Sequence, residues 1–397
     1  MKKKKAIWIM VLCYLAYTSI YIARLNLSTA SPELQKSVMD SAQIGLLGSV
    51  FSIVYACGRL LNGWLSDRVP PYMMITGGLL IVGCANIAIG FFPPFTAILL
   101  LWGVNAYAQS MLWSSVLEIV SALYDPETAK RKASYMVTTV ATGNVLGIIV
   151  STVLVSRFGV GYAFTVPGII TLFFAVLILL STREIHPKPK MQAHLSMRQI
   201  LKQKDVRLLL IPTFCHGVIK DNISLWMVLY FVSRFNIDLK ASAMFVLFVP
   251  LVGFAGRMLH PLCYRLCREN EHSASFVGFV LSALALIPLF LDTVTPLVAA
   301  VCLSLVYAAV SIINTSMLSI FPLRYAATGN VSSISGMLDF LTYGGAGVSS
   351  VLYGVLIDRM GQSGYAPMYL SWAVISVISM AFLMLLIKND KRSKEYA

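Results

Sequence analysis

The stretch YLAYTSIYIARLNLS, residues 14–28, places an arginine inside an apolar run long enough to cross a membrane. At 100° per residue, an arc of roughly 80° on one helical face carries three phenols, a hydroxyl and a permanent positive charge. The residues on that face are Tyr14, Tyr17, Tyr21, Arg24 and Ser28. A charge at the centre of a span costs about 2.5–3.5 kcal/mol to insert, so it usually faces a water-filled cavity or a partner. The stretch therefore predicts half of an anion-binding site on the first span.

A second base stands in a matching context in the other half of the chain. RLNLS at 24–28 and KDNIS at 220–224 share the pattern basic-x-Asn-aliphatic-Ser, at an offset of 220 minus 24, or 196 residues. Three more pairs follow at offsets of 198, 200 and 202: GRLL at 58–61 with GRML at 256–259, YA at 107–108 with YA at 307–308, and RFG at 157–159 with RMG at 359–361. The slow drift is what changes in loop length produce. The pattern therefore indicates two parallel halves, the plan of many secondary transporters.

The composition is that of a polytopic membrane protein, with 58% hydrophobic and 12% charged residues over 397 positions. We expect an all-α membrane protein of twelve transmembrane helices in two six-helix pseudo-symmetric bundles. The spans begin near residues 6, 42, 73, 96, 133, 160, 207, 241, 273, 295, 329 and 366. The predicted domains are an N-terminal bundle at 1–182, a cytoplasmic linker at 183–206 with a short interfacial helix near 197–204, and a C-terminal bundle at 207–397.

The net charge of +14 raises the question of nucleic-acid binding, but the placement of the charge argues against it. With the N-terminus in the cytoplasm, 22 of the 31 basic residues fall on the cytoplasmic side and 5 on the opposite side. This positive-inside bias predicts a multi-pass protein of the cell (inner or plasma) membrane with both termini cytoplasmic. We expect a lipid bilayer as surroundings, no nucleic-acid partner, no cofactor and no metal site. The seven cysteines imply no disulfide framework.

Polar side chains also occur within the fourth span. Gln109 and Trp113 are one helical turn apart, which places them on one face. Glu118 lies about 180° around the helix from Gln109, so the two are not expected to share a cavity. The third span carries no candidate site residue.

The seventh and eleventh spans carry the titratable groups of the second half. His216 precedes Lys220 by one turn, as a proton-sensitive ligand or a packed histidine. Asp221 points about 100° away from Lys220, so it can pair with another helix or weaken the positive field. In the eleventh span Asp339 precedes Tyr343 by one turn, and its carboxylate can pair with Lys220, line the cavity or carry a coupling proton.

The loop after the second span contains a short motif with a known counterpart. GWLSDR at 63–68 resembles the Gly-x-x-x-Asp-Arg loop signature of the major facilitator superfamily, and the plan of twelve spans in two halves is similar to that family. The resemblance implies a cytoplasmic gate made by Gly63, Asp67 and Arg68, in which the aspartate meets a helix N-terminus and basic residues. A solvated loop pair is the alternative. Val69-Pro70-Pro71 departs from the usual basic continuation and predicts a weaker gate.

Within that superfamily the chain resembles the organophosphate:phosphate antiporters, which include the glycerol-3-phosphate and hexose-phosphate carriers. The segments that carry the resemblance are YIARLN at 21–26, QSMLW at 109–113 and YGGAG at 343–347. It implies that Arg24 and Lys220 grip the phosphate of a small anionic substrate, that transport is by alternating access, and that the protein is a monomer. The further substrate-binding residues we expect are Tyr17, Tyr21, Gln109, Trp113, His216 and Tyr343, with the tyrosines and the glutamine as hydrogen-bond donors.

Two other functions remain open from the sequence. A proton-coupled symporter or exporter of organic anions or amphiphiles would use Asp339, Glu118 or His216 to carry the proton. A transporter-like sugar-phosphate sensor would bind the anion without moving it. An enzyme is not expected, because the chain shows no nucleophile-base arrangement and no nucleotide-binding loop.

Overall fold

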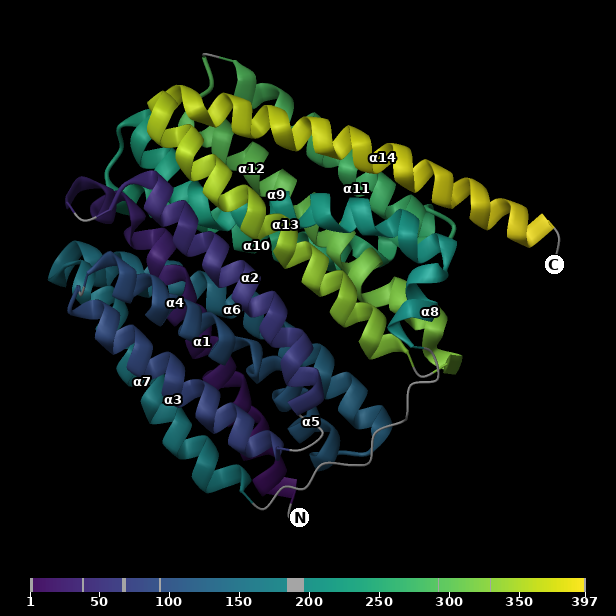
Figure 1. Ribbon diagram of the computed structural model, residues 1–397, viewed down its shortest axis with the longest axis horizontal. Coiled ribbons are helices and arrows are strands. Elements are labelled where there is room, and N and C mark those ends of the chain that lie inside the picture. The colour runs from purple at the N-terminus through teal and green to yellow at the C-terminus, as the bar shows by residue number, and fades with distance from the viewer. Residues whose placement is uncertain are drawn as a thin grey trace. The chain divides into compact units, whose positions relative to one another are not determined.

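A computed structural model describes residues 3–37, 39–65, 69–92, 94–183, 196–291, 293–328 and 330–395, and their regular structure is helical throughout. The first half contains α1 (Lys3–Ser37), α2 (Ser41–Leu65), α3 (Pro71–Gly90), α4 (Phe95–Ser110), α5 (Leu112–Leu123), α6 (Pro126–Phe158) and α7 (Val160–Thr182) (Figure 1). The second contains α8 (Met197–Lys202), α9 (Lys204–Phe235), α10 (Leu239–Leu266), α11 (Glu271–Leu286), α12 (Pro296–Asn314), α13 (Val331–Met360) and α14 (Tyr365–Glu395). The second half also contains four short helical segments: η1 (Ile287–Phe290), η2 (Thr315–Ile320), η3 (Phe321–Thr328) and η4 (Gly361–Gly364).

Ten helical runs in the described part of the chain are long and apolar enough to cross a membrane. One run, Phe95–Leu123, joins α4 to α5, and another, Ser333–Asp390, holds both α13 and α14. The remaining helix of spanning length is α9, with 32 residues, which carries Lys220 and Asp221 near its middle. The ten runs become twelve spans when α13 and α14 are counted separately and α9 is added. The twelve expected spans are therefore present, and the all-α fold is confirmed.

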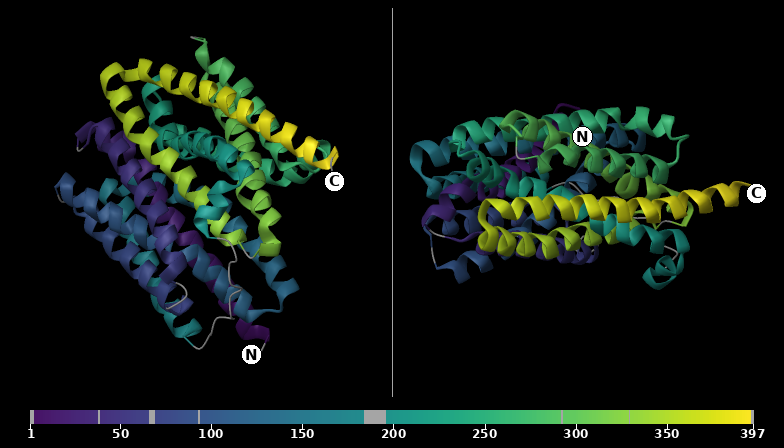
Figure 2. Two further views of the ribbon diagram at one scale, coloured as in Figure 1. Left: turned by 45° about the vertical axis from the view of Figure 1, so that its right-hand side comes forward. Right: turned by 90° about the horizontal axis from the view of Figure 1, so that it is seen from above.

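The chain divides into two compact units, Met1–Lys190 with Asp238–Ala243 and Met191–Ile237 with Met244–Ala397. Within each unit the helices pair in the same way (Figures 1 and 2). In the first unit α1 packs on α6 and α7, and α3 packs on α4 and α7; in the second α9 packs on α13 and α14, and α11 packs on α12 and α14. The repeat that the sequence predicted is therefore a repeat of helix packing.

The matched glycines of the repeat lie at equivalent helix contacts. A Cβ on Gly58 of α2 would meet the Ser110 side chain of α4 at 2.2 Å. A Cβ on Gly256 of α10 would meet the Ala308 carbonyl oxygen of α12 at 2.7 Å. Both glycines thus allow the second span of a half to lie directly against the fourth.

Local sequence explains several helix ends. The Asp125 side chain accepts a hydrogen bond from the Thr128 amide at 3.1 Å at the start of α6, where Pro126 takes the first helical position. Ser196 and Gln199 form a capping box at the start of α8. The short helix expected near 197–204 is therefore confirmed as Met197–Lys202, whereas residues 184–195 of the predicted linker lie outside the described residues.

Charged side chains join four elements at one end of the second unit. Arg324 of η3 donates from Nη1 and Nη2 to the Asp390 carboxylate of α14 at 3.1 and 2.9 Å, and from Nε to Glu271 of α11. The Tyr325 hydroxyl lies 3.0 Å from both oxygens of Asp205 at the start of α9. This cluster, defined by these five residues, connects α9, α11, η3 and α14.

Candidate functional site

Arg24 of α1 lies against two aromatic rings of α2. Its Cζ atom is 4.7 Å from the centroid of the Phe51 ring and 5.3 Å from that of Tyr55. The two rings are stacked with centroids 5.9 Å apart and planes 14° apart. The negative faces of aromatic rings attract a guanidinium, so this pair holds the half-buried Arg24 in one place. Sequence reasoning did not identify Phe51 and Tyr55, although their spacing of four residues puts them on one face of a helix.

The aromatic residues expected beside Arg24 form a cluster in the first unit. The Tyr17 ring is 5.8 Å from that of Tyr21 and 5.1 Å from that of Trp113 on α5. Gly143 of α6 makes room for Tyr21, because a Cβ there would lie 2.6 Å from the Tyr21 Cβ. The structure therefore brings Tyr17, Tyr21 and Trp113 together.

Gln109 lies next to a local irregularity of the fourth span. Helix α4 ends at Ser110 and α5 begins at Leu112, while Met111 between them keeps right-handed helical angles and its amide donates to the Ala108 carbonyl at 3.2 Å. Trp113 lies just after this irregularity, on α5. The Gln109 side chain is 1% exposed, and its Nε2 donates to Asn105 Oδ1 at 3.2 Å. Its amide donor is thus engaged inside the unit. Glu118, on α5, is half-buried.

Lys220 of α9 has two neighbours inside the second unit. Its Nζ lies 4.9 Å from the centroid of the Tyr343 ring on α13 and 3.7 Å from Asp221 Oδ1. The sequence analysis pointed Asp221 away from Lys220, but the flexible four-carbon lysine stem lets the charges of adjacent residues meet. Asp339 lies on α13 one turn before Tyr343 and is half-buried.

His216 is fully buried between helices of the second unit. Its Nε2 lies 3.3 Å from the carbonyl oxygen of Val310 on α12. This contact joins α9 to α12 one turn from Lys220, and it leaves His216 Nδ1 buried without a hydrogen-bond partner.

The other candidates are placed as follows. Gly63 lies in the last turn of α2, and Asp67 and Arg68 lie outside the described residues. No group of three metal-ligating side chains occurs among the residues that the structure describes.

The fourth and tenth spans both depart from regular α-helix. The fourth has a one-residue irregularity at Met111, whose backbone stays right-handed helical, and the tenth passes from α12 into the π-helix η2 and then the 3-10 segment η3. These spans correspond to each other in the repeat, since both contain its Tyr-Ala pair. A π-helical turn inside a helix is frequent at functional sites, and the larger departure lies in the second unit.

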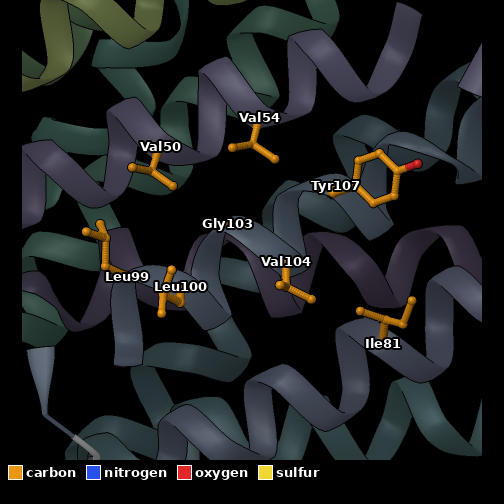
Figure 3. A pocket seen from close by; sticks show the side chains of 8 residues that line it. All are labelled: Val50, Val54, Ile81, Leu99, Leu100, Gly103, Val104 and Tyr107. Atoms are coloured by element: carbon orange, nitrogen blue, oxygen red, sulfur yellow. The ribbon is translucent and has the colours of Figure 1, made fainter. Parts of the chain in front are cut away.

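An apolar groove of about 450 Å³ lies between α2, α3 and α4 (Figure 3). Its lining is Val50, Val54, Ile81, Leu99, Leu100, Gly103, Val104 and Tyr107. It has no charged side chain in its lining, so it is unsuited to an anion.

Residues 13–346 match the family model of the Major Facilitator Superfamily. The chain belongs to this superfamily. Its members are transporters, so the protein is a multi-pass membrane transporter and not an enzyme. The resemblance to organophosphate carriers is confirmed by the names of relatives.

A probable hexose phosphate transport protein of Chlamydia trachomatis is 27% identical over 182 residues, which cover 45% of this chain but only 40% of that relative. The phosphoglycerate transporter protein of Salmonella typhimurium is 22% identical, with 88% and 83% covered. The probable sulfoacetate transporter SauU of Cupriavidus necator is 26% identical, with 94% and 92% covered.

Solved structures of transporters share the fold. A bacterial homolog of the human lysosomal transporter Spinster, inward-facing and unoccupied, aligns with a TM-score of 0.80 and 16% identity over 97% of both chains. A mutant of the nucleoside transporter NupG aligns with a TM-score of 0.76 and 16% identity over 96% of this chain and 99% of that one. At such identity the likeness concerns the fold alone.

Proposed function

We propose that this protein is a secondary active transporter that exchanges a small phosphate ester for inorganic phosphate by alternating access. The observation that carries the proposal is a pair of bases, Arg24 and Lys220, at equivalent positions on the first helix of each half. Each is held near aromatic ring faces, at 4.7 Å from Phe51 and 4.9 Å from Tyr343. The names of the hexose phosphate and phosphoglycerate relatives support a phosphate-containing substrate.

The two bases suit a phosphate group in different ways. Arginine offers a planar fork to two phosphate oxygens, whereas lysine offers a compact and movable charge. Around them the proposed substrate-binding residues are Tyr17, Tyr21, Gln109, Trp113, His216 and Tyr343. The proposed charge-pair or coupling residues are Asp339, Asp221 and Glu118, and the proposed gate residues are Gly63, Asp67 and Arg68.

In the proposed mechanism one anion binds both bases and neutralises them. Without it two positive charges would repel as the halves close, which favours exchange over one-way flux. Asp221 reduces that repulsion because it already lies 3.7 Å from Lys220, so an incoming anion must compete with it. The cell membrane location, the cytoplasmic termini and the domain limits at 1–182, 183–206 and 207–397 are part of the same proposal.

The test is uptake of labelled phosphate into proteoliposomes preloaded with phosphate, glycerol 3-phosphate, a hexose phosphate or buffer alone. We expect flux only into preloaded vesicles, and loss of flux in Arg24→Ala and Lys220→Ala. Lys36→Ala is the matched control, because Lys36 is exposed and pairs with Glu33 at 2.8 Å outside the proposed site. Wild-type flux in both site variants would refute the proposal.

A sulfonate is the second candidate substrate. The relative named as a probable sulfoacetate transporter matches nearly the whole of both chains. Competition of phosphate uptake by sulfoacetate would favour it. Flux into empty vesicles under a pH gradient would indicate proton symport, and binding without flux would indicate a sensor.

A further inference from the structure

Four buried amides form a hydrogen-bonded relay inside the first unit. Asn26 of α1 donates from Nδ2 to Asn86 Oδ1 of α3 at 2.8 Å. Asn86 donates from Nδ2 to Asn105 Oδ1 of α4 at 3.3 Å, and Gln109 donates from Nε2 to the same oxygen at 3.2 Å. The first three are 0% exposed and Gln109 is 1% exposed. The relay ends at a residue proposed to bind substrate.

Backbone groups set the direction of every bond in the relay. Asn26 Nδ2 also donates to the Ala163 carbonyl at 3.2 Å, and Asn26 Oδ1 accepts from the Leu27 amide at 2.9 Å. Asn86 Nδ2 also donates to the Val82 carbonyl at 3.0 Å. A carbonyl can only accept and an amide N–H can only donate, so these contacts fix which end of each side chain is oxygen.

The fixed direction of these hydrogen bonds decides which atom Gln109, the last residue of the relay, has left to offer. Gln109 must turn its Nε2 to Asn105, so the atom it has left to offer is the acceptor Oε1. Both Gln109 Oε1 and Asn105 Nδ2 are buried without a hydrogen-bond partner. They are two of several such atoms among the described residues, and each such group needs an explanation. The sequence analysis expected an amide donor from Gln109, and the relay has used that donor.

Packing does not account for the relay. At the offset of 200 residues shown by Tyr107 and Tyr307, Asn105 corresponds to Leu305 and Gln109 to Ala309. The second unit packs the corresponding pair of helices, α11 and α12, with these apolar residues in place. Amides in hydrocarbon are expensive, and they mark function when they are retained.

We propose that the relay makes Gln109 the residue that recognises a hydroxyl group of the substrate. A hydroxyl donates to Gln109 Oε1 and can accept from Asn105 Nδ2, whereas the oxygens of a phosphate dianion only accept. Asn105 is the positioning residue, because its Oδ1 engages Gln109 Nε2 and leaves Gln109 Oε1 as the atom without a hydrogen-bond partner. The substrate class is then a hydroxylated organic phosphate, such as a polyol or sugar phosphate; this inference rests on the proposed function.

The Gln109 side chain is 1% exposed in this conformation, so a substrate hydroxyl reaches it only after the helices around it move, as the proposed alternating access requires.

The experiment compares two esters that differ only in hydroxyl groups, glycerol 3-phosphate and propyl phosphate, as competitors of labelled phosphate uptake. We expect wild type to prefer glycerol 3-phosphate by about fivefold, the worth of one neutral hydrogen bond. Gln109→Met, close in volume and without an acceptor, should bring the ratio near one. Asn105→Leu should lower the same ratio by releasing Gln109.

Thr171→Val is the matched control, since Thr171 is a fully buried polar residue of α7 whose hydroxyl donates to the Pro167 and Gly168 carbonyls, outside the relay. Its ratio should equal that of wild type. Ligand-induced shifts of the thermal unfolding midpoint in detergent give the ratio for any variant that does not transport. The inference is overturned, while phosphate exchange stands, if wild type shows no preference for glycerol 3-phosphate or if the preference survives in Gln109→Met. If wild type neither binds nor takes up phosphate, the inference and the proposed function are both overturned.

Discussion

The closest helix crossing in the second unit gives the sharpest prediction. A Cβ on Gly217 of α9 would lie 1.7 Å from the Thr342 carbonyl oxygen of α13, and a Cβ on Gly345 would lie 2.2 Å from the Phe214 carbonyl oxygen. Ordinary contact begins at 3.4 Å, so Gly217→Ala requires a displacement of 3.4 minus 1.7, or 1.7 Å, at this point. The obstructing atom belongs to the backbone and has no rotamer to change.

The energetic effect follows from two opposing terms. Overpacking costs about 1–3 kcal/mol, and the upper value applies here because backbone opposes backbone. Alanine regains about 1 kcal/mol over glycine through helix propensity. We therefore expect Gly217→Ala to destabilise the protein by about 2 kcal/mol. The separated helices should also strain the hydrogen bond from Asn222 Nδ2 to Ser349 Oγ, now 2.7 Å long.

The assay is thermal unfolding in detergent, followed by the reaction of buried thiols such as Cys13 and Cys215 with a fluorogenic dye. Gly344→Ala is the matched control, because nothing lies within 4 Å of its Cβ position on the same helix as Gly345. Gly217→Ala and Gly345→Ala should lower the midpoint, and Gly344→Ala should leave it unchanged or raise it. A Gly217→Ala midpoint equal to that of Gly344→Ala would refute the reasoning.

Three further predictions concern charge. Asp221→Asn removes the carboxylate that competes with the substrate anion for Lys220. The half-saturation concentration for phosphate uptake should therefore fall about 2- to 5-fold, the worth of a partly exposed ion pair. An unchanged or higher value would contradict this. Phe51→Leu removes one of the two rings that contact Arg24. It should raise the half-saturation concentration for phosphate about 2- to 30-fold, since cation–π contacts contribute about 0.5–2 kcal/mol. Phe51→Tyr keeps a ring and should stay near wild type, and equal values for the two variants would argue against the ring contact. Asp390→Ala removes the acceptor of two charged hydrogen bonds from Arg324. It should lower the thermal midpoint clearly more than Lys36→Ala, which breaks only the exposed ion pair with Glu33. Equal midpoints for the two variants would show that the Arg324 cluster contributes little to stability.

The sequence was a good guide to features that repeat or that follow from hydropathy. Span number, the duplicated plan and the helix near 197–202 could be predicted because each depends on local composition or on order along the chain. Arg24 and Lys220 could be identified as candidates because a charged side chain within a membrane span costs free energy to insert and usually marks a functional site.

Features that depend on contacts between spans could not be predicted. Phe51 and Tyr55 look like ordinary apolar residues until the structure places them beside a guanidinium. The one-residue irregularity at Met111 has neither a proline nor a glycine beside it that would predict it. The pairing of Lys220 with Asp221 was missed because an angle measured around the helix axis ignores the reach of a long side chain.

The amide relay of the first unit bears on how the chain is assembled in the membrane. Its members arrive with three different spans, and an amide unpaired in hydrocarbon costs several kcal/mol. Asn26 meets Asn86 when the third span arrives, and the bond from Asn86 to position 105 needs the fourth. The bond from Asn26 to the Ala163 carbonyl needs α7. The second unit has Leu305 and Ala309 at the positions that match Asn105 and Gln109, so its fourth span brings no amide to this point. The hydrogen bonds inside the first unit are therefore completed in steps, and the last of them forms when α7 is in place.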